Sequence, residues 1–266
     1  MKKRIISAFI MLLLFLPLLI LGDKYFAIFM SILAVLGLHE IIQLKNNNKN
    51  IPSLMKFFSY IIVVFLVFYN VDSIDFHYVL DYKMICVIIF SFLLPIVFIN
   101  DNHTYNIDDA LYLIGSTLFI GYSFNLITVT RNYDFMYIVY LLLISTMTDV
   151  FALITGKLIG THLLCPDISP NKTVEGLIGG TFMGVFIASS FYHIFINSNY
   201  VIINLVFLTT FLSLIGQLGD LVFSMIKRYY GKKDFSNIIP GHGGILDRVD
   251  SLIFVVLAFI FIIDII

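Results

Sequence analysis

Long apolar runs, broken by short polar stretches, extend through almost the whole chain. A helix needs about 20 apolar residues to cross the roughly 30 Å hydrocarbon core of a bilayer. The pattern therefore predicts nine membrane-spanning helices in an all-α fold, a polytopic helical bundle. The third, fourth and ninth are short, so one of them is a candidate for a re-entrant or interfacial helix. The predicted ranges are 5–22, 25–44, 54–70, 84–99, 110–130, 135–155, 176–196, 201–222 and 251–264.

Composition supports a membrane protein over a soluble one. Hydrophobic residues are 60% of the chain and charged residues 12%, whereas globular proteins average about 45–50% and about 25%. A net charge of −1 gives no reason to expect nucleic-acid binding. Cys86 and Cys165 form neither a metal-ligand spacing nor a disulfide framework. The basic start resembles a signal peptide, but it has no small-residue cleavage site, so we interpret 5–22 as a retained helix.

Loop charge predicts the orientation, because cytoplasmic loops carry the excess of lysine and arginine. With the N-terminus inside, three basic residues fall outside: Lys24, Lys83 and Arg131. Thirteen fall inside: Lys2, Lys3, Arg4, Lys45, Lys49, Lys56, Lys157, Lys172, Lys227, Arg228, Lys232, Lys233 and Arg248. We expect one domain over 1–266, with N-terminal helices in 1–134 and a catalytic region in 135–266. Its polar loops, 156–175 and 223–250, would both face the cytoplasm.

Carboxylates inside apolar spans are costly and mark candidate sites. Glu40 is either a hydrogen-bond partner within the bundle or a site residue, and the same two interpretations stay open for Asp149. Asp264 lies close enough to the C-terminus to reach the interface. Gly176, Gly180 and Gly184 form a row of small residues that favours helix packing inside one bundle over a dimer interface.

The densest polar region begins at Asp220. At 100° per residue, Asp220, Ser224, Lys227 and Arg228 share one face of a helix. Snorkelling of a cationic helix end explains the two basic residues. It does not explain a carboxylate one turn deeper in the apolar span, so this stripe is a candidate site.

A glycine-rich run, Pro240-Gly241-His242-Gly243-Gly244, follows, and then Asp247, Arg248 and Asp250. Glycines let backbone N–H groups approach an anion closely, although such runs also occur as plain turns. Aspartates plus substrate phosphates are how Mg²⁺ is usually held. Nearby cations would neutralise phosphate oxygens. These residues favour a metal and polyphosphate site.

The other polar loop contains Ser169-Pro170-Asn171-Lys172-Thr173-Val174-Glu175-Gly176. Thr173 is a candidate N-cap for the helix that follows, and by itself the segment is typical of an ordinary helix entry. Because the charge count puts both loops on one side of the membrane, they can contribute to one site. The residues alone therefore indicate phosphoryl-type transfer at the cytoplasmic membrane face, with no indication of which nucleotide or lipid is used.

The stretch from Ser224 to Asp250 resembles the signature of the phosphatidate cytidylyltransferases, or CDP-diacylglycerol synthases, without a gap. Gly219-Asp220 and the segment 169–176 are also similar to that family. One departure is visible: the family usually has Asp-Thr-(Gly or Phe)-Ala-Tyr where this chain has Asp149-Val150-Phe151-Ala152-Leu153. Asp149 is retained, but the hydroxyl-bearing side chains beside it are not.

The resemblance implies Mg²⁺-dependent transfer of CMP from CTP to phosphatidic acid, which gives CDP-diacylglycerol and pyrophosphate in phospholipid biosynthesis. It implies Asp220 and Asp247 as metal ligands, with Asp250 as a helper and a second, monovalent cation as an open question. It assigns catalytic roles to Asp220, Asp247, Lys227 and Arg228. The implied substrate-binding residues are Lys172, Ser224, Lys233, His242, Gly243, Gly244 and Arg248. The family is often homodimeric, and a bacterial inner membrane with a cytoplasmic site is the expected location.

Two other functions remain as alternatives. A sister enzyme would move nucleotidyl or phosphoryl groups onto an isoprenoid lipid or another lipid alcohol or phosphate. A transporter would use the buried carboxylates for ion coupling. Transport predicts charges near the bilayer midplane and inverted repeats, but the charges here cluster at one predicted face and we find no repeat.

Overall fold

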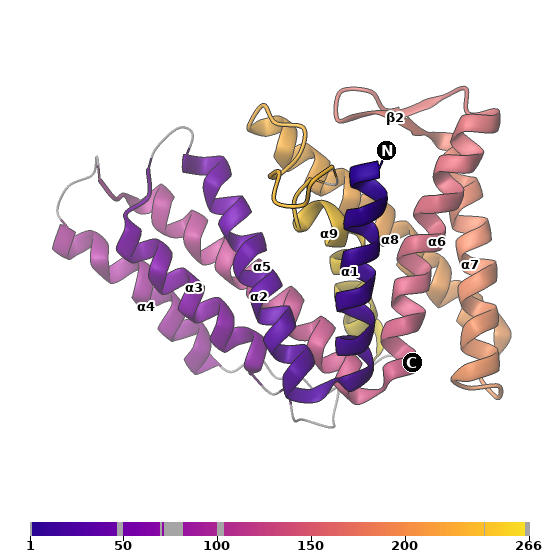
Figure 1. Cartoon of the computed structure of the whole chain (residues 1–266), viewed down its shortest axis with the longest axis horizontal. Helices are drawn as coiled ribbons and strands as arrows, with labels where there is room; N and C mark the ends of the chain where they lie inside the picture. Colours follow the sequence, from indigo (N-terminus) through magenta and orange to yellow (C-terminus); the bar gives the residue numbers. More distant parts are fainter. Residues whose placement is uncertain are drawn as a thin grey trace. The chain divides into compact units, whose positions relative to one another are not determined.

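The computed structural model describes residues 2–46, 50–69, 71, 82–99, 104–241 and 243–263. Within these residues the chain forms nine helices and one short hairpin (Figure 1). The helices are α1 (Lys2–Leu21), α2 (Asp23–Asn46), α3 (Ser53–Phe68), α4 (Tyr82–Ile99), α5 (Ile107–Tyr133), α6 (Phe135–Ile159), α7 (Val174–Phe195), α8 (Ile202–Tyr229) and α9 (Leu246–Ile263). Each predicted span corresponds to one helix. His242 and Asp264, both singled out from the sequence, lie outside the described residues.

Six of the described helices are long and apolar enough to cross a membrane: α2, α4, α5, α6, α7 and α8. The shorter apolar helices include α3, with 16 residues. At 1.5 Å per residue such a helix is about 24 Å long, less than the roughly 30 Å core. The helical membrane bundle is therefore confirmed in its general form, with six qualifying spans in the described part of the chain instead of the nine predicted.

The fold is nearly all helical, as predicted, and the polar loop between α6 and α7 adds an antiparallel hairpin of β1 (Leu163–Cys165) and β2 (Ser169–Thr173). Thr173 ends β2 and caps α7, and its hydroxyl accepts a hydrogen bond from the Gly176 N–H at 3.0 Å. The predicted N-cap is confirmed. The Glu175 carboxylate accepts hydrogen bonds from the N–H and hydroxyl of Thr161, which tie the start of the hairpin to α7.

The chain divides into two compact units. The first comprises residues 1–133 and 234–246, and the second comprises residues 134–233 and 247–266. The boundary after Tyr133 lies one residue from the predicted division between N-terminal helices and catalytic region. Part of the glycine-rich signature, 234–246, nevertheless belongs to the first unit. The expectation of a single domain stays a prediction.

In the first unit, side chains of α5 hold the ends of two other helices. Arg131 donates to the carbonyl oxygens of Leu19 and Ile20, at 2.8 and 2.7 Å. Asn125 donates to the carbonyls of Val67 and Tyr69. The last carbonyl groups of a helix have no partner within the helix. In an apolar surrounding they need such donors, so these two residues close the C-terminal ends of α1 and α3.

In the second unit, α6 and α7 pack side by side through glycines (Figure 1). A Cβ atom at Gly180 would lie 2.6 Å from the Thr148 carbonyl oxygen, and one at Gly184 would lie 2.3 Å from the Thr148 hydroxyl. Glycine lets the two backbones approach this closely. The glycine row therefore serves packing within one bundle, as the favoured interpretation predicted.

Candidate active site

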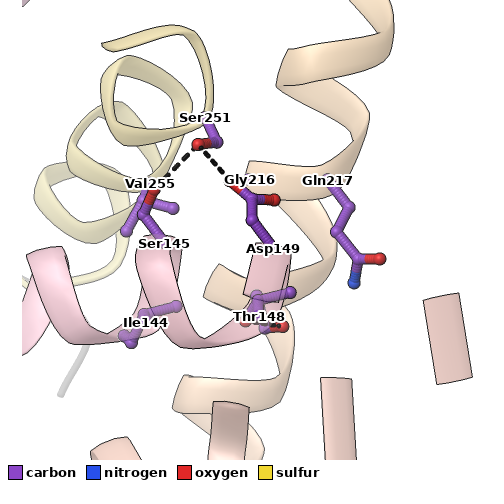
Figure 2. A pocket seen from close by; sticks show the side chains of 9 residues that line it. Ile144, Ser145, Thr148, Asp149, Gly216, Gln217, Ser251 and Val255 are labelled. Atoms are coloured by element: carbon purple, nitrogen blue, oxygen red, sulfur yellow. Dashed lines mark hydrogen bonds between the residues drawn. The ribbon is translucent and has the colours of Figure 1, made fainter. Parts of the chain in front are cut away.

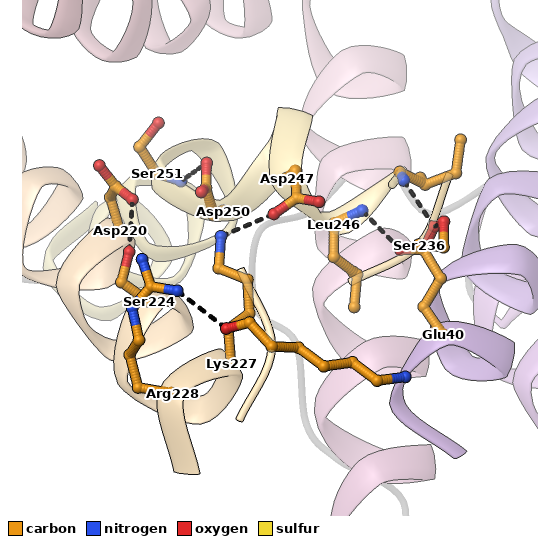
Figure 3. Close-up of polar contacts among 12 residues, drawn as sticks. Glu40, Asp220, Ser224, Lys227, Arg228, Ser236, Leu246, Asp247, Asp250 and Ser251 are labelled. Carbon is orange, nitrogen blue, oxygen red and sulfur yellow. Dashed lines mark hydrogen bonds and ion pairs between the residues drawn. The ribbon is translucent and has the colours of Figure 1, made fainter. Parts of the chain in front are cut away.

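The polar stripe predicted from the sequence lies on the last three turns of α8. Ser224 Oγ lies 3.5 Å from Asp220 Oδ1, and Lys227 continues the row toward the helix end (Figure 3). Arg228 takes a different direction, since its guanidinium donates to the carbonyl oxygens of Ile168 in the hairpin turn and Lys232 after the helix. The helix thus brings Asp220, Ser224 and Lys227 together and uses Arg228, in this conformation, to hold neighbouring backbone.

Lys227 is paired with Asp247, in the first turn of α9. The distance from Lys227 Nζ to Asp247 Oδ1 is 2.6 Å, and the two side chains are 10% and 5% exposed. A carboxylate in the first turn of a helix is stabilised by the helix dipole. A pair this buried leaves neither charge uncompensated, which is what a low-dielectric site requires.

A second ion pair joins β2 to α8. Lys172 Nζ lies 2.6 Å from Asp220 Oδ2, and both side chains are about one-quarter exposed. The hairpin therefore brings Lys172 to the candidate site, as the shared location of the two polar loops predicted. Because both side chains are partly exposed, the pair is not enclosed within the bundle.

Two more carboxylates surround Asp220. Asp149 of α6 and Asp250 of α9 are both close enough to Asp220 to repel it electrostatically. Asp149 Oδ2 accepts a hydrogen bond from Ser251 Oγ at 3.1 Å, and Ser251 is bonded in turn to Ser145 at 2.7 Å (Figure 2). Three helices of this unit thus bring acidic side chains toward one place.

The space beside Asp149 is tightly filled. It is a gap of about 130 Å³ bordered by α6, α8 and α9, with no room for a water molecule (Figure 2). Its polar lining includes Thr148 and Ser213, which are hydrogen-bonded to each other at 2.9 Å. Gln217 donates to Thr181 of α7 at 2.8 Å. The polar groups behind Asp149 therefore satisfy one another directly, and its carboxylate is held in position by protein.

The remaining predicted residues are distributed as follows. Lys233 and Arg248 are exposed. Gly243 and Gly244 lie in the first unit, in the loop 234–246, where the Ile239 N–H donates to the Gly243 carbonyl at 2.9 Å. Gly241 and Gly243 have φ of 80° and 87°, values that favour glycine because L side chains clash there. Their positive φ explains two glycines of the run as requirements of a tight turn.

The carboxylates of the site are the type of ligand that Mg²⁺ prefers, but they do not form a complete set of protein ligands for it. Among the described residues, no three His, Cys, Asp or Glu side chains are grouped closely enough to hold a metal by themselves. Mg²⁺ is usually bound by one or two carboxylates together with water and substrate phosphates. Asp220, with Asp149 and Asp250 close by, offers such a set. The mutual repulsion of these carboxylates is what a divalent cation would relieve.

Sequence reasoning flagged Glu40 and Asp149 as costly carboxylates without finding their partners. It missed Ser145 and Ser251, which support Asp149. A signal for Ser251 was available, because it follows Asp250 directly in the first turns of an otherwise apolar helix. No comparable signal marked Ser145, since serine in a membrane helix commonly bonds its own backbone.

Taken together, the fold and the site are those of a helical membrane protein with lysine–aspartate pairs at its polar loops. The chain belongs to the cytidylyltransferase family, whose model matches residues 2–266. It is similar to the phosphatidate cytidylyltransferase of Staphylococcus aureus (strain COL), with 37% identity over 255 residues that cover 96% of each chain. The enzyme of the same name from Staphylococcus haemolyticus (strain JCSC1435) is 36% identical over 255 residues, with the same coverage.

Proposed function

We propose that this protein is a phosphatidate cytidylyltransferase, which transfers CMP from CTP to phosphatidic acid and forms CDP-diacylglycerol and pyrophosphate. The observation that carries the proposal is the match to enzymes of that name over 96% of the chain. The site supports it, because aspartates and lysines that suit a metal and phosphates converge on α8.

In the reaction, a phosphate oxygen of phosphatidic acid attacks the α-phosphorus of CTP. The new P–O bond forms as the bond from the α-phosphorus to the bridging oxygen breaks, and pyrophosphate leaves with that electron pair. A phosphomonoester has a second pKa of about 6, so the attacking group is already ionised near neutral pH. No general base is needed, and catalysis consists of positioning and charge stabilisation.

The lysines provide that stabilisation. In the structure Lys172 and Lys227 are each held by an aspartate, which keeps the ammonium groups oriented before substrates arrive. We assign Lys172, Lys227, Arg228, Lys233 and Arg248 to the phosphates of CTP and phosphatidic acid. Ser224 beside Asp220 would donate to a phosphate. The backbone of Gly243 and Gly244, together with His242, would line the nucleotide.

Asp220 and Asp247 are the proposed Mg²⁺ ligands, with Asp250 assisting. When bound, the cation would withdraw charge from the phosphate oxygens and so favour attack at phosphorus. Asp247 is bonded to Lys227 in this structure, so its carboxylate would have to contact the ammonium group and the metal at the same time. A second, monovalent cation is compatible with this proposal, because it would balance the negative charge of the additional carboxylates.

The location follows from the charge distribution. The topology predicted from the sequence puts both polar loops on the side with the excess of lysine and arginine, so we propose a cytoplasmic site. The relatives are bacterial, which supports the bacterial inner (cell) membrane as the location. A homodimer is proposed from the family resemblance alone.

The test uses protein purified in detergent with phosphatidic acid, Mg²⁺ and each of the four ribonucleoside triphosphates. We expect pyrophosphate release with CTP, formation of CDP-diacylglycerol, and loss of both in Asp220→Asn at normal expression and membrane insertion. Turnover with a different lipid acceptor and none with phosphatidic acid would favour the sister enzyme. Near-normal turnover of Asp220→Asn at saturating Mg²⁺ would refute the metal assignment.

A further inference from the structure

Glu40 of α2 is a fully buried carboxylate that accepts hydrogen bonds from three groups of the loop 234–246. Its side chain is 0% exposed. Glu40 Oε1 accepts from Ser236 Oγ at 2.6 Å and from the Ile245 N–H at 2.8 Å, and Oε2 accepts from the Leu246 N–H at 3.0 Å (Figure 3). A buried carboxylate without such donors would be strongly unfavourable. The side chain is therefore matched to this loop.

These three donors lie at the two ends of the loop. Ser236 is near its start, and its hydroxyl oxygen also accepts from the Ile238 N–H at 3.2 Å. Ile245 and Leu246 are at its end, where α9 begins. One carboxylate thus closes the segment 236–246, which contains Gly241 and Gly243. The N-terminal end of a helix favours a negative charge, which strengthens the closure at α9.

Gly244 shows how tightly the carboxylate is packed against the loop. A Cβ atom at Gly244 would lie 2.5 Å from Glu40 Oε1 and 2.7 Å from its carboxyl carbon. Any other residue would push the carboxylate away from the backbone donors that follow. The third glycine of the run is therefore explained by Glu40, whereas the first two are explained by their positive φ.

We propose that Glu40 is a positioning residue for nucleotide binding, which holds the glycine loop in the shape that receives CTP. The inference rests on the proposed function, because that function gives the loop its ligand. Glu40 does not touch the substrate in this account; it acts through the backbone of residues 243–246.

The decisive experiment compares Glu40→Gln with Asp109→Asn in purified protein. Asp109 is a matched control, since it is a buried carboxylate of α5 paired with Lys45 at 2.9 Å. Both variants should lower thermal stability. Because the charged acceptor at the loop is replaced by a neutral amide with a single acceptor oxygen, Glu40→Gln alone should raise the KM for CTP by about tenfold. The KM for phosphatidic acid should stay within about twofold of wild type, since that change corresponds to less than 0.5 kcal/mol.

Hydrogen exchange provides a readout that needs no turnover. The peptide covering 239–246 should exchange about tenfold faster in Glu40→Gln than in wild type, because one of the two amide protons bonded to Glu40 loses its acceptor and the other is left with a neutral one. Asp109→Asn should leave that peptide unchanged. This measurement stands even if wild type proves inactive with CTP and phosphatidic acid, which would refute the proposed function and not the loop closure.

Ser236→Ala keeps the inference testable if Glu40→Gln does not fold. It removes one described donor to Glu40 and should also raise the KM for CTP, by a smaller factor. In the double variant the two effects should be less than additive, because both remove the same hydrogen bond. Unchanged CTP affinity and unchanged exchange of 239–246 in folded Glu40→Gln, or in folded Ser236→Ala, would reduce Glu40 to a structural residue and overturn the proposal.

Discussion

Lys227 and Asp247 form the most buried charged contact of the candidate site, a 2.6 Å ion pair between the last turns of α8 and the first turn of α9. Removing charges from water is costly, and the cost is recovered only while both partners are present. We therefore expect these two residues to contribute both to the stability of the second unit and to the proposed chemistry.

Replacing one partner of this pair should separate the two contributions. Asp247→Asn removes the carboxylate that is bonded to the buried Lys227 ammonium and should cost about 3–5 kcal/mol of stability. The double variant Lys227→Met, Asp247→Leu should recover most of that loss, because an apolar pair of similar volume needs no desolvation. Neither protein should release pyrophosphate from CTP. Thermal unfolding in detergent and the pyrophosphate assay check both parts, and turnover by the double variant would show that neither side chain is needed.

Lys172 should compete with Mg²⁺ for Asp220. Because the pair is about one-quarter exposed, its contribution is at most ~1 kcal/mol, so Lys172→Ala should lower the half-saturating Mg²⁺ concentration by about twofold to fivefold. The same change should raise the KM for a phosphate-bearing substrate or lower kcat.

The control for that prediction is Lys157→Ala, which removes an exposed lysine at the end of α6. It alters the net charge equally and should leave the Mg²⁺ dependence unchanged. If Lys172→Ala behaves in the same way as Lys157→Ala, the segment 169–176 serves only as an entry to α7.

Gly180→Ala should weaken the contact between α6 and α7. The new Cβ would meet the Thr148 carbonyl at 2.6 Å and the Ala152 Cβ at 2.7 Å, and such overpacking typically costs about 1–3 kcal/mol. Gly115→Ala in α5 is the matched control, since nothing lies within 4 Å of its Cβ. Alanine there should stabilise the helix by up to ~1 kcal/mol. A lower melting temperature for Gly180→Ala and a higher one for Gly115→Ala, each relative to wild type, would support this account. Equal shifts in the two variants would contradict it.

The departure from the family pattern at Val150 should have little consequence. Val150 is 50% exposed, and the hydrogen bond to Asp149 comes from Ser251 on α9. Val150→Thr should therefore leave kcat and KM within about twofold, as is usual for exposed positions. Ser251→Ala should lower kcat, because it removes the donor that orients Asp149. A gain in activity from Val150→Thr would mean that the missing hydroxyl limits this enzyme.

The helices could be predicted because long apolar runs leave a membrane protein few alternatives. The helix ends could not. The helix α8 extends to Tyr229 although its predicted span ends at residue 222. Likewise α9 begins at Leu246, whereas its predicted span starts at residue 251. The prediction missed the first residues of the helix because Asp247, Arg248 and Asp250 make them polar. A criterion of apolarity cannot detect a helical turn that carries charges.

The pairing of side chains was harder to foresee than their chemistry. The sequence marks Asp220, Lys227 and Asp247 as candidates. It does not indicate that Lys172 pairs with Asp220, or that Lys227 pairs with Asp247. The hairpin was missed because β1 has three residues and β2 has five polar or small ones, too few for an alternating pattern. Glu40 accepts a hydrogen bond from the N–H of Ile245, which lies 205 residues further along the chain. No local sequence pattern encodes a contact over that separation.

The route of the chain through the signature limits how this protein can be divided or recombined. Residues 134–233 belong to the second unit, 234–246 to the first, and 247–266 to the second again. A cut between Tyr133 and Asp134, the apparent joint, would leave Glu40 on one fragment and Ser236, Ile245 and Leu246 on the other. Chimeras that exchange the N-terminal helices with those of a relative would have to carry the segment 234–246 along with them. The thirteen residues from Asp234 to Leu246 therefore have to come from the same parent protein as the N-terminal helices.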